Sequence, residues 1–249
     1  IITLNFNLGT ASGTLKMIDE AIAFYNDEKV RALDGERFDF DGLIEELNYD
    51  LLGNSLLRFE RESIDPALLD RAAKVLGEYY QKELNENPNP YEMLDEIYCN
   101  YRRSQFFQGK LSCTEYIEDY WQFCKYSLEH DSLESQEGLE FSDTRYFQVA
   151  VNHLPNIMEM LDLYGDEYHG TPGIRECCVK AYVHVIRSVP RTQNDTFVND
   201  VVCRSLGEFL KYLSRDEVNS MLLMQVMVSR DELTVVHSAM VEQIARQIL

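Results

Sequence analysis

The stretch Ser229-Arg-Asp-Glu-Leu-Thr-Val-Val-His-Ser-Ala-Met-Val-Glu-Gln-Ile-Ala-Arg-Gln-Ile-Leu249 carries the clearest helix signals in the sequence. Ser229 and Glu232 have the spacing of a capping box, in which the two side chains accept each other's backbone N–H groups. Apolar side chains then recur at helical spacing, at Leu233, Val236, Met240, Ile244 and Ile248. His237 falls on the same stripe, so the stretch predicts an amphipathic helix with a histidine on its apolar face.

Similar patterns run along most of the chain. Helical periodicity is expected at 14–25, 41–59, 66–79, 91–107, 116–124, 146–163, 174–189 and 198–213. Pro66 suits the first position of its helix, whereas Pro155 lies inside another and is expected to kink or restart it. Only Leu4 to Leu8 alternates as a strand does. We therefore expect an all-α fold of about ten to twelve helices packed as successive antiparallel pairs, a helical-repeat-like array with at most one short N-terminal strand.

Two segments interrupt these patterns. Asn85 to Pro90 holds two prolines and three asparagines, which favours a turn, and Glu129 to Ser142 is acidic with little apolar periodicity. We expect an N-terminal helical region at 1–130 and a C-terminal helical region at 140–249. The capping-box sequence also occurs at Ser214-Arg-Asp-Glu217, so two short helices should follow each other near the end.

Charge restricts the classes of partner. The 249 residues include 43 acidic and 23 basic side chains, giving a formal net charge of -20. Such a chain repels phosphate backbones and anionic lipids, so nucleic acid and membrane surfaces are not expected as partners. No run approaches the ~20 apolar residues needed to span a bilayer. Solubility alone explains an acidic surface, and a basic partner fits it better than nucleic acid or a membrane surface.

The cysteines indicate a reducing compartment. They lie in segments rich in apolar residues and show no C-x-x-C spacing: Cys99, Cys113, Cys124, Cys177, Cys178 and Cys203. Reduced cysteines in such segments behave as small apolar residues. We expect a cytoplasmic protein.

Residues Leu233 to Ala245 resemble the first helix of HD-type metal-dependent phosphohydrolases. The matching pattern, T-x-x-H-S-x-x-V-x-x-x-A, places His237 where that family has the first histidine of an H…HD…D metal set. The resemblance implies a divalent metal and a phosphoester substrate such as a cyclic dinucleotide. In that family the histidine-aspartate dyad lies downstream, whereas His130-Asp131 lies upstream of His237.

The resemblance therefore implies a helical sensory or scaffold region, catalytically incomplete by itself, whose partner is a downstream catalytic domain. The start at Ile1 and the lack of a stop signal near Leu249 fit this expectation of a fragment. The alternatives are a core histidine at 237, and a non-catalytic helical-repeat module that binds a protein or peptide through tyrosine-rich surfaces. A homodimer also stays open.

Three further clusters have a plain structural explanation beside a functional one. Asp166, Glu167 and His169 carry metal-ligand atoms but are expected to form a solvated loop. Cys177-Cys178 should be one core cysteine and one partly exposed neighbour. Arg102-Arg103 lies among aromatic residues that suit base stacking: Tyr98, Tyr101, Phe106 and Phe107. A helix whose aromatic side chains form the core and whose arginines are exposed is favoured over that function. No catalytic residue is assigned.

Overall fold

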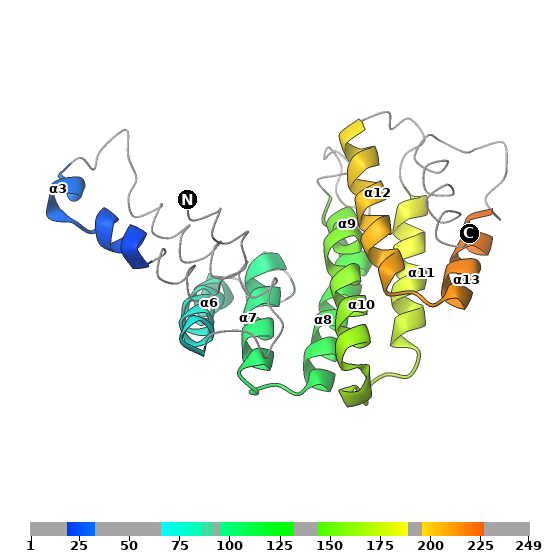
Figure 1. Ribbon diagram of the computed structural model, residues 1–249, viewed down its shortest axis with the longest axis horizontal. Coiled ribbons are helices and arrows are strands. Elements are labelled where there is room, and N and C mark those ends of the chain that lie inside the picture. Colours follow the sequence, from blue (N-terminus) through cyan, green and yellow to red (C-terminus); the bar gives the residue numbers. More distant parts are fainter. Residues whose placement is uncertain are drawn as a thin grey trace. The chain divides into compact units, whose positions relative to one another are not determined.

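The computed structural model describes residues 19–32, 66–86, 88–89, 91, 95–131, 144–188 and 196–226. These residues are mostly helical and contain no strand, which confirms the all-α class for the part described (Figure 1). None of the described helices is long and apolar enough to cross a membrane. The expected N-terminal strand, the helix at 41–59 and the helix after Ser229 lie outside the described residues.

The chain divides into two compact units, Ile1–Ser112 and Cys113–Leu249. The expected regions 1–130 and 140–249 stay a prediction, because residues 132–143 lie outside the described part. Each unit is described by itself below.

The first unit contains α3 (Glu28–Arg31), α6 (Pro66–Glu86) and α7 (Asp95–Phe107). Residues 19–25 are also helical, as the sequence predicted for 14–25. Asp27 caps α3 by accepting a hydrogen bond from the Lys29 N–H at 2.8 Å. An ion pair between Asp19 and Arg71 joins the first of these helical segments to α6.

Proline and glycine set the limits of α6 and α7. Pro66 begins α6, as predicted, and α6 ends at Glu86, within the segment of prolines and asparagines. Helix α7 begins at Asp95, later than the predicted start at Tyr91. Gly109 follows α7 with φ 71°, a left-handed conformation that glycine adopts without the steric cost of a Cβ. The N–H groups of Gly109 and Lys110 bond back to Phe106 and Gln105, which ends the helix in the glycine manner.

The second unit is a helical bundle built around α10 (Leu154–Tyr164). This helix contacts α8 (Cys113–His130), α11 (Ile174–Arg187) and α12 (Thr196–Lys211). Its side chains at Leu154, Ile157 and Met158 are fully buried, as expected for a helix packed on several sides. Helix α8 includes Glu129 and His130, so the predicted loop at 129–142 begins later than expected. A 3-10 turn at Gly165–Glu167 likewise occupies part of the solvated loop predicted for Asp166, Glu167 and His169.

The helix type changes just before Pro155, and a new α-helix, α10, starts there. Helix α9 (Arg145–Gln148) passes into a π-helical turn at Val149–His153 before α10 begins. Proline has no N–H for the Val151 carbonyl four residues earlier, and its ring crowds that carbonyl. The Ser205 hydroxyl from α12 donates to this carbonyl at 3.2 Å. The predicted restart at Pro155 is confirmed, and a neighbouring helix supplies the missing donor.

Ser205 also bonds to a residue of a third helix, α11. Ser205 Oγ lies 3.0 Å from the Tyr182 hydroxyl, which comes from α11. Since Ser205 has one proton and donates it to the carbonyl, Tyr182 is the donor in the second bond. Tyr182 also stacks on Phe209 with ring centroids 4.0 Å apart. The Tyr182 hydroxyl, Ser205 and the Val151 carbonyl are therefore hydrogen-bonded in series.

The capping box predicted at Ser214 to Glu217 is present. The Ser214 N–H donates to Glu217 Oε2 at 2.7 Å, and the Glu217 N–H donates to Ser214 Oγ at 3.3 Å. Helix α13 (Arg215–Val226) begins directly after this serine. The second predicted box, at Ser229, lies outside the described residues.

Candidate functional site

A groove of about 750 Å³ follows the α6/α7 pair of the first unit. On α6 it is lined by one stripe at helical spacing, from Asp70 through Lys74, Gly77 and Gln81 to Asn85. On the other side it is lined by Tyr101 and Gln105 of α7, with Gln108 and Lys110 beyond the helix end. The opposite side of α6 is apolar, with Ala72 and Leu76 fully buried. The helix is thus amphipathic, and its polar stripe forms one wall of the groove.

The two helices run in opposite directions and approach closely at Gly77. Gln108 Nε2, after α7, donates to Asp70 Oδ1, near the start of α6, at 3.0 Å. A Cβ on Gly77 would lie 3.2 Å from Tyr101 Cε2, so the glycine allows the tyrosine ring to lie against the α6 backbone. Tyr80 stacks on the same ring with centroids 4.6 Å apart. Tyr101 is therefore held as a fixed aromatic surface in the groove.

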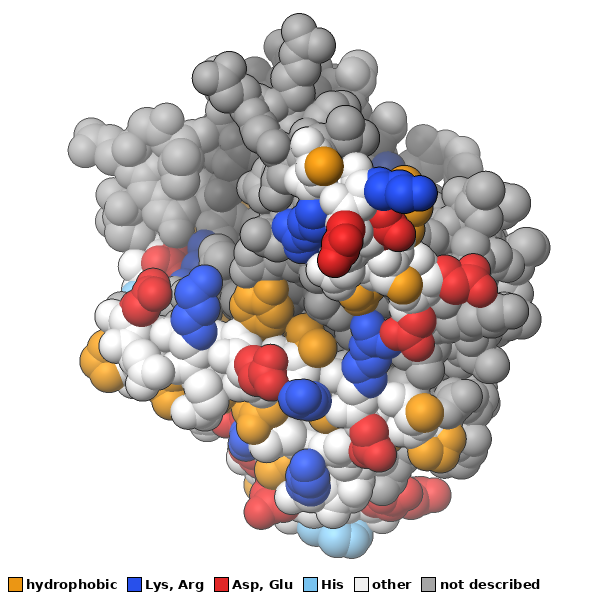
Figure 2. All heavy atoms as spheres, turned by 90° about the vertical axis from the view of Figure 1, so that its left-hand side faces the viewer, with side chains coloured by type: hydrophobic (Ala, Val, Ile, Leu, Met, Phe, Trp, Pro, Cys, Tyr) orange, Lys and Arg blue, Asp and Glu red, His pale blue; other side chains and the backbone are white. Residues whose placement is uncertain are grey.

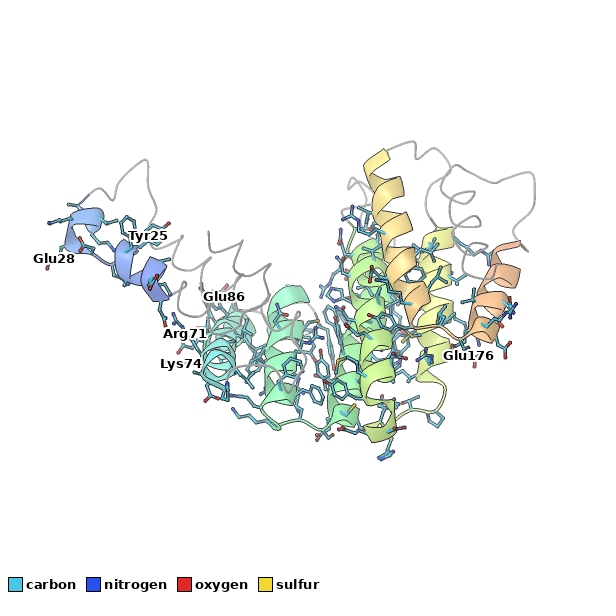
Figure 3. The ribbon with its side chains drawn as sticks, viewed as in Figure 1. Tyr25, Glu28, Arg71, Lys74, Glu86 and Glu176 are labelled. Carbon is cyan, nitrogen blue, oxygen red and sulfur yellow. The ribbon has the colours of Figure 1, made fainter. Side chains whose placement is uncertain are left out.

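Several polar side chains of the groove are already bonded to each other. Gln105 Nε2 donates to the Tyr101 hydroxyl at 2.9 Å, and Arg102 Nη1 donates to Gln105 Oε1 at 2.7 Å. Lys74 lies 4.0 Å from Glu78 on the next turn of α6. Figure 3 shows Lys74 extending from α6 into solvent. The hydrogen bonds among Tyr101, Arg102 and Gln105 order the α7 wall of the groove, whereas the exposed Lys74–Glu78 pair contributes little.

Four lining side chains remain without such a bond. Within the part of the chain that the structure describes, no hydrogen bond or ion pair engages the side chains of Gln81, Lys82, Asn85 and Lys110. All four are exposed. Amide and ammonium groups in a concave site are suited to hydrogen-bonding a ligand, because a bound group replaces water there. The groove thus combines a fixed aromatic surface with unoccupied donors and acceptors.

A second cluster, in the second unit, holds the loop between α10 and α11 against α8. The Glu118 carboxylate accepts hydrogen bonds from the Tyr168 hydroxyl at 2.5 Å, the Thr171 N–H at 2.5 Å and the Thr171 hydroxyl at 3.0 Å. The His169 N–H also donates to Thr114 Oγ1, at 2.9 Å. We call Glu118, Tyr168 and Thr171 the loop clasp.

Protonation in the loop clasp follows from its geometry. Partial burial raises the pKa of Glu118, but the hydrogen bonds from Tyr168 and Thr171, with the charge of Lys125, outweigh burial and leave this pKa below its usual value. Burial and the adjacent Glu118 carboxylate raise the pKa of Tyr168. Tyr168 therefore keeps its proton and donates it, and the clasp is a satisfied structural contact.

Glycine allows the loop clasp to form. A Cβ on Gly170 would collide with Glu118 Oε1 and with the Tyr168 side chain. Gly173 has φ 77° directly before α11, a conformation that favours glycine. A small pocket of about 310 Å³ lies beside this loop.

A buried histidine lies in the π-helical turn. His153 is 7% exposed, and its Nδ1 lies 2.9 Å from the Tyr120 hydroxyl. Asn156 Nδ2 also approaches this hydroxyl, at 3.3 Å. The imidazole meets the rings of Tyr120 and Phe123 edge to face. His153 is a hydrogen-bonded core residue that the sequence analysis did not single out.

The metal candidates from the sequence are not brought together in the described part. Asp166, Glu167 and His169 are exposed, and the neighbouring Tyr168 makes the contact with α8. The described residues contain no group of three or more His, Cys, Asp or Glu side chains that could hold a metal ion. His237 lies outside the described residues.

The cysteine pair agrees with its prediction, whereas the arginine pair requires a correction. Cys178 is fully buried and Cys177 is exposed, as expected for neighbours on one helix. Burial raises the pKa of the Cys178 thiol to about 12, so it stays protonated at neutral pH. Arg103 was expected to be exposed, but it is 5% exposed and its guanidinium lies over the Phe107 ring, 5.7 Å from the centroid. Its aromatic neighbours hold it inside by a cation–π contact.

His130 and Asp131, the only HD pair of the sequence, belong to no group of three metal-ligating side chains among the residues that the structure describes. His130 stacks on Tyr126 and its Nδ1 lies 2.9 Å from the Tyr126 carbonyl oxygen. Asp131 Oδ2 lies 3.5 Å from Arg145 Nε, beside the start of α9. Both residues therefore make structural contacts at the C-terminal end of α8.

The chain matches no family model, no curated protein and no solved structure. The groove along α6 and α7 is thus the candidate site by its own geometry. A polar stripe at 70, 74, 77, 81 and 85 was the available sequence signal, but a polar stripe alone does not distinguish a solvated helix face from a groove wall.

Proposed function

We propose that this protein is a helical binding module and that the groove along α6 and α7 accepts a peptide segment of a partner protein. The observation that carries the proposal is the combination of a fixed Tyr101 ring with the unengaged side chains of Gln81 and Asn85 in one groove. Aromatic residues are favoured in protein interfaces, and amide side chains can bond both N–H and C=O groups of a peptide backbone. The function proposed is recognition without chemistry at this site.

The geometry favours a segment longer than a single side chain. The α6 stripe from 70 to 85 rises by about 22 Å at 1.5 Å per residue. An extended peptide rises about 3.3 Å per residue, so the stripe matches about six or seven residues. Because the groove is held in place by Gly77 and Tyr101, binding requires little ordering of the protein, which lowers its entropic cost.

The wider arrangement belongs to the same proposal. The α6/α7 pair is one unit of an array of about ten to twelve helices packed as antiparallel pairs. In such an array each pair contacts its neighbours and leaves one surface for ligands. The protein would then be cytoplasmic, with a protein partner and with a homodimer as a further arrangement.

A selection experiment tests the binding function. A displayed library of random twelve-residue peptides is selected on the 249-residue protein and, in parallel, on Gln81→Trp. Gln81 is exposed at the groove, so a tryptophan there fills the groove without entering the core. Glu86→Trp is the matched control, since Glu86 is exposed on α6 and does not line the groove. The proposal expects peptides retained by the wild type and Glu86→Trp and lost on Gln81→Trp; equal retention on all three contradicts it.

A second proposal concerns the rest of the protein to which this module belongs. The similarity of Leu233 to Ala245 to the first HD-type helix favours a sensory or scaffold region of a phosphohydrolase, with His237 as one ligand of a divalent metal. A cyclic dinucleotide or another phosphoester would be the substrate of the complete enzyme. An in-frame histidine-aspartate dyad downstream of Leu249 would support this, together with loss of bound metal in His237→Ala of the extended protein. A stop codon directly after Leu249 contradicts it.

A further inference from the structure

The charged side chains of the α6/α7 groove are unequally engaged. Asp70 accepts the amide of Gln108, and Glu78 lies against Lys74. Lys82 and Lys110 are the lining charges that no ion pair or hydrogen bond engages among the described residues. Both unengaged charges are therefore positive, although the chain as a whole carries -20.

Local charge dominates over net charge at contact distance. At physiological ionic strength the Debye length is about 8 Å, so distant acidic side chains are largely screened from a ligand that touches two lysines. Basic and acidic side chains are interspersed on the face drawn in Figure 2, and no large area of one sign occurs among its described residues. Two unengaged ammonium groups in one groove thus distinguish this place from the surrounding mixed surface.

The two lysines are placed toward opposite ends of the groove. Lys110 follows Gln108, which is bonded to Asp70 near the start of α6, whereas Lys82 lies further along the same helix. From position 70 to position 82 the helix rises by about 18 Å. An extended peptide covers this distance in about five to six residues. Two carboxylates separated by that spacing would reach both ammonium groups at once.

We infer that the groove selects an extended acidic peptide, with Asp or Glu side chains about five to six positions apart pairing with Lys82 and Lys110. This inference rests on the proposed function of the groove and adds the chemistry of its ligand. The peptide backbone lies along Tyr101 and bonds to Gln81 and Asn85. Charge pairing at the two ends fixes the register of the peptide, because electrostatic complementarity gives specificity more than affinity.

The test repeats the peptide selection on the 249-residue protein with charge-reversed variants. Lys82→Glu/Lys110→Glu reverses both unengaged charges, and both positions are exposed, so the helix pair should fold unchanged. Lys29→Glu is the matched control, since Lys29 is exposed on α3 and does not line the groove. Far-UV circular dichroism and the unfolding midpoint confirm that each variant is folded. Anisotropy titrations of the enriched peptides, with each glutamate and aspartate changed to its amide, then measure affinity.

The expected result is enrichment of peptides with two acidic residues at the stated spacing. Their affinity should fall about tenfold or more on the double reversal, stay within about twofold on Lys29→Glu, and weaken with added salt. Acidic peptides that bind both variants equally would overturn the assignment to these lysines. Apolar or basic peptides that are lost on Gln81→Trp would overturn the acidic class and leave the binding function standing. If no enriched peptide responds to Gln81→Trp, the binding function itself fails.

Discussion

The interface between α6 and α7 differs in kind from the interface between α10 and its neighbours. Fully buried apolar side chains close the core around α10, where the Tyr182 hydroxyl, Ser205 and the Val151 carbonyl are hydrogen-bonded in series. The α6/α7 pair buries Ala72 and Leu76 on the side of α6 away from the groove, and its groove side carries the unengaged side chains of Gln81, Lys82, Asn85 and Lys110. The core around α10 is closed and stabilises the fold. The α6/α7 pair, by contrast, leaves hydrogen-bonding groups available to a ligand. The substitutions below test this contrast from the largest expected effect to the smallest.

Phe209→Ala should have the largest effect on stability. Phe209 is fully buried and stacks on Tyr182, so truncation leaves a cavity and removes the stacking contact. Large-to-small changes of this kind cost about 3–5 kcal/mol. Phe24, which is 60% exposed, supplies the matched control, and Phe24→Ala should change the free energy of unfolding by less than about 0.5 kcal/mol. Urea denaturation measures both; similar losses for the two variants would contradict the assigned core.

Ser205→Ala should destabilise the bundle by about 1–3 kcal/mol, because it leaves the Val151 carbonyl and the Tyr182 hydroxyl without their partner. The loss should be smaller in a Pro155→Ala background, since the alanine introduced there has an N–H that can bond the Val151 carbonyl. A double-mutant cycle measures this coupling. Additive effects of the two substitutions would show that Ser205 does not compensate for the proline.

Ser214→Ala should cost about 1 kcal/mol through loss of the N-cap of α13. Glu217 should then lose part of its placement, although its bond to Arg175 at 2.9 Å remains. Hydrogen exchange of amides in 215–226 provides the readout. Unchanged exchange in that helix, with an unchanged denaturation midpoint, would argue against this cap.

The loop clasp should make stability fall in acid. The folded pKa of Glu118 lies below its unfolded value, so its contribution is fully present above the unfolded pKa of about 4.3. The contribution is lost as the pH falls through the folded pKa. Because Glu118 is largely exposed to solvent screening, the effect should not exceed about 1 kcal/mol. Unfolding free energies of the wild type and Glu118→Gln should converge between pH 5 and pH 3; a constant difference would contradict the clasp.

Local sequence signals predicted two helix starts. Pro66 and the Ser214 to Glu217 box act within one turn of the chain, so their effects can be inferred without knowing the fold. The restart at Pro155 was predicted for the same reason. Its repair by Ser205 was not, because that contact joins residues 54 positions apart in the sequence.

The candidate site was harder to predict because it depends on which helix faces meet. Tyr98, Phe106 and Phe107 were predicted correctly as core, whereas Tyr101 lines the groove. The burial of Arg103 was not predicted, because it depends on the position of this arginine over Phe107. The groove requires the close approach of Tyr101 to Gly77 across the α6/α7 pair. The Glu118 clasp likewise joins a helix to a loop about 50 residues away. Sequence periodicity identifies the polar or apolar face of each helix separately. It does not determine which other helix or loop that face contacts.

Hydrogen–deuterium exchange of the 249-residue protein with and without an enriched peptide tests the central claim most directly. The account predicts slower exchange in residues 70–85 and 101–110, no change in 113–130 and 145–187, and loss of this protection in Gln81→Trp. Protection confined to the second unit, or protection that persists in Gln81→Trp, would contradict the assignment of the binding site to the groove.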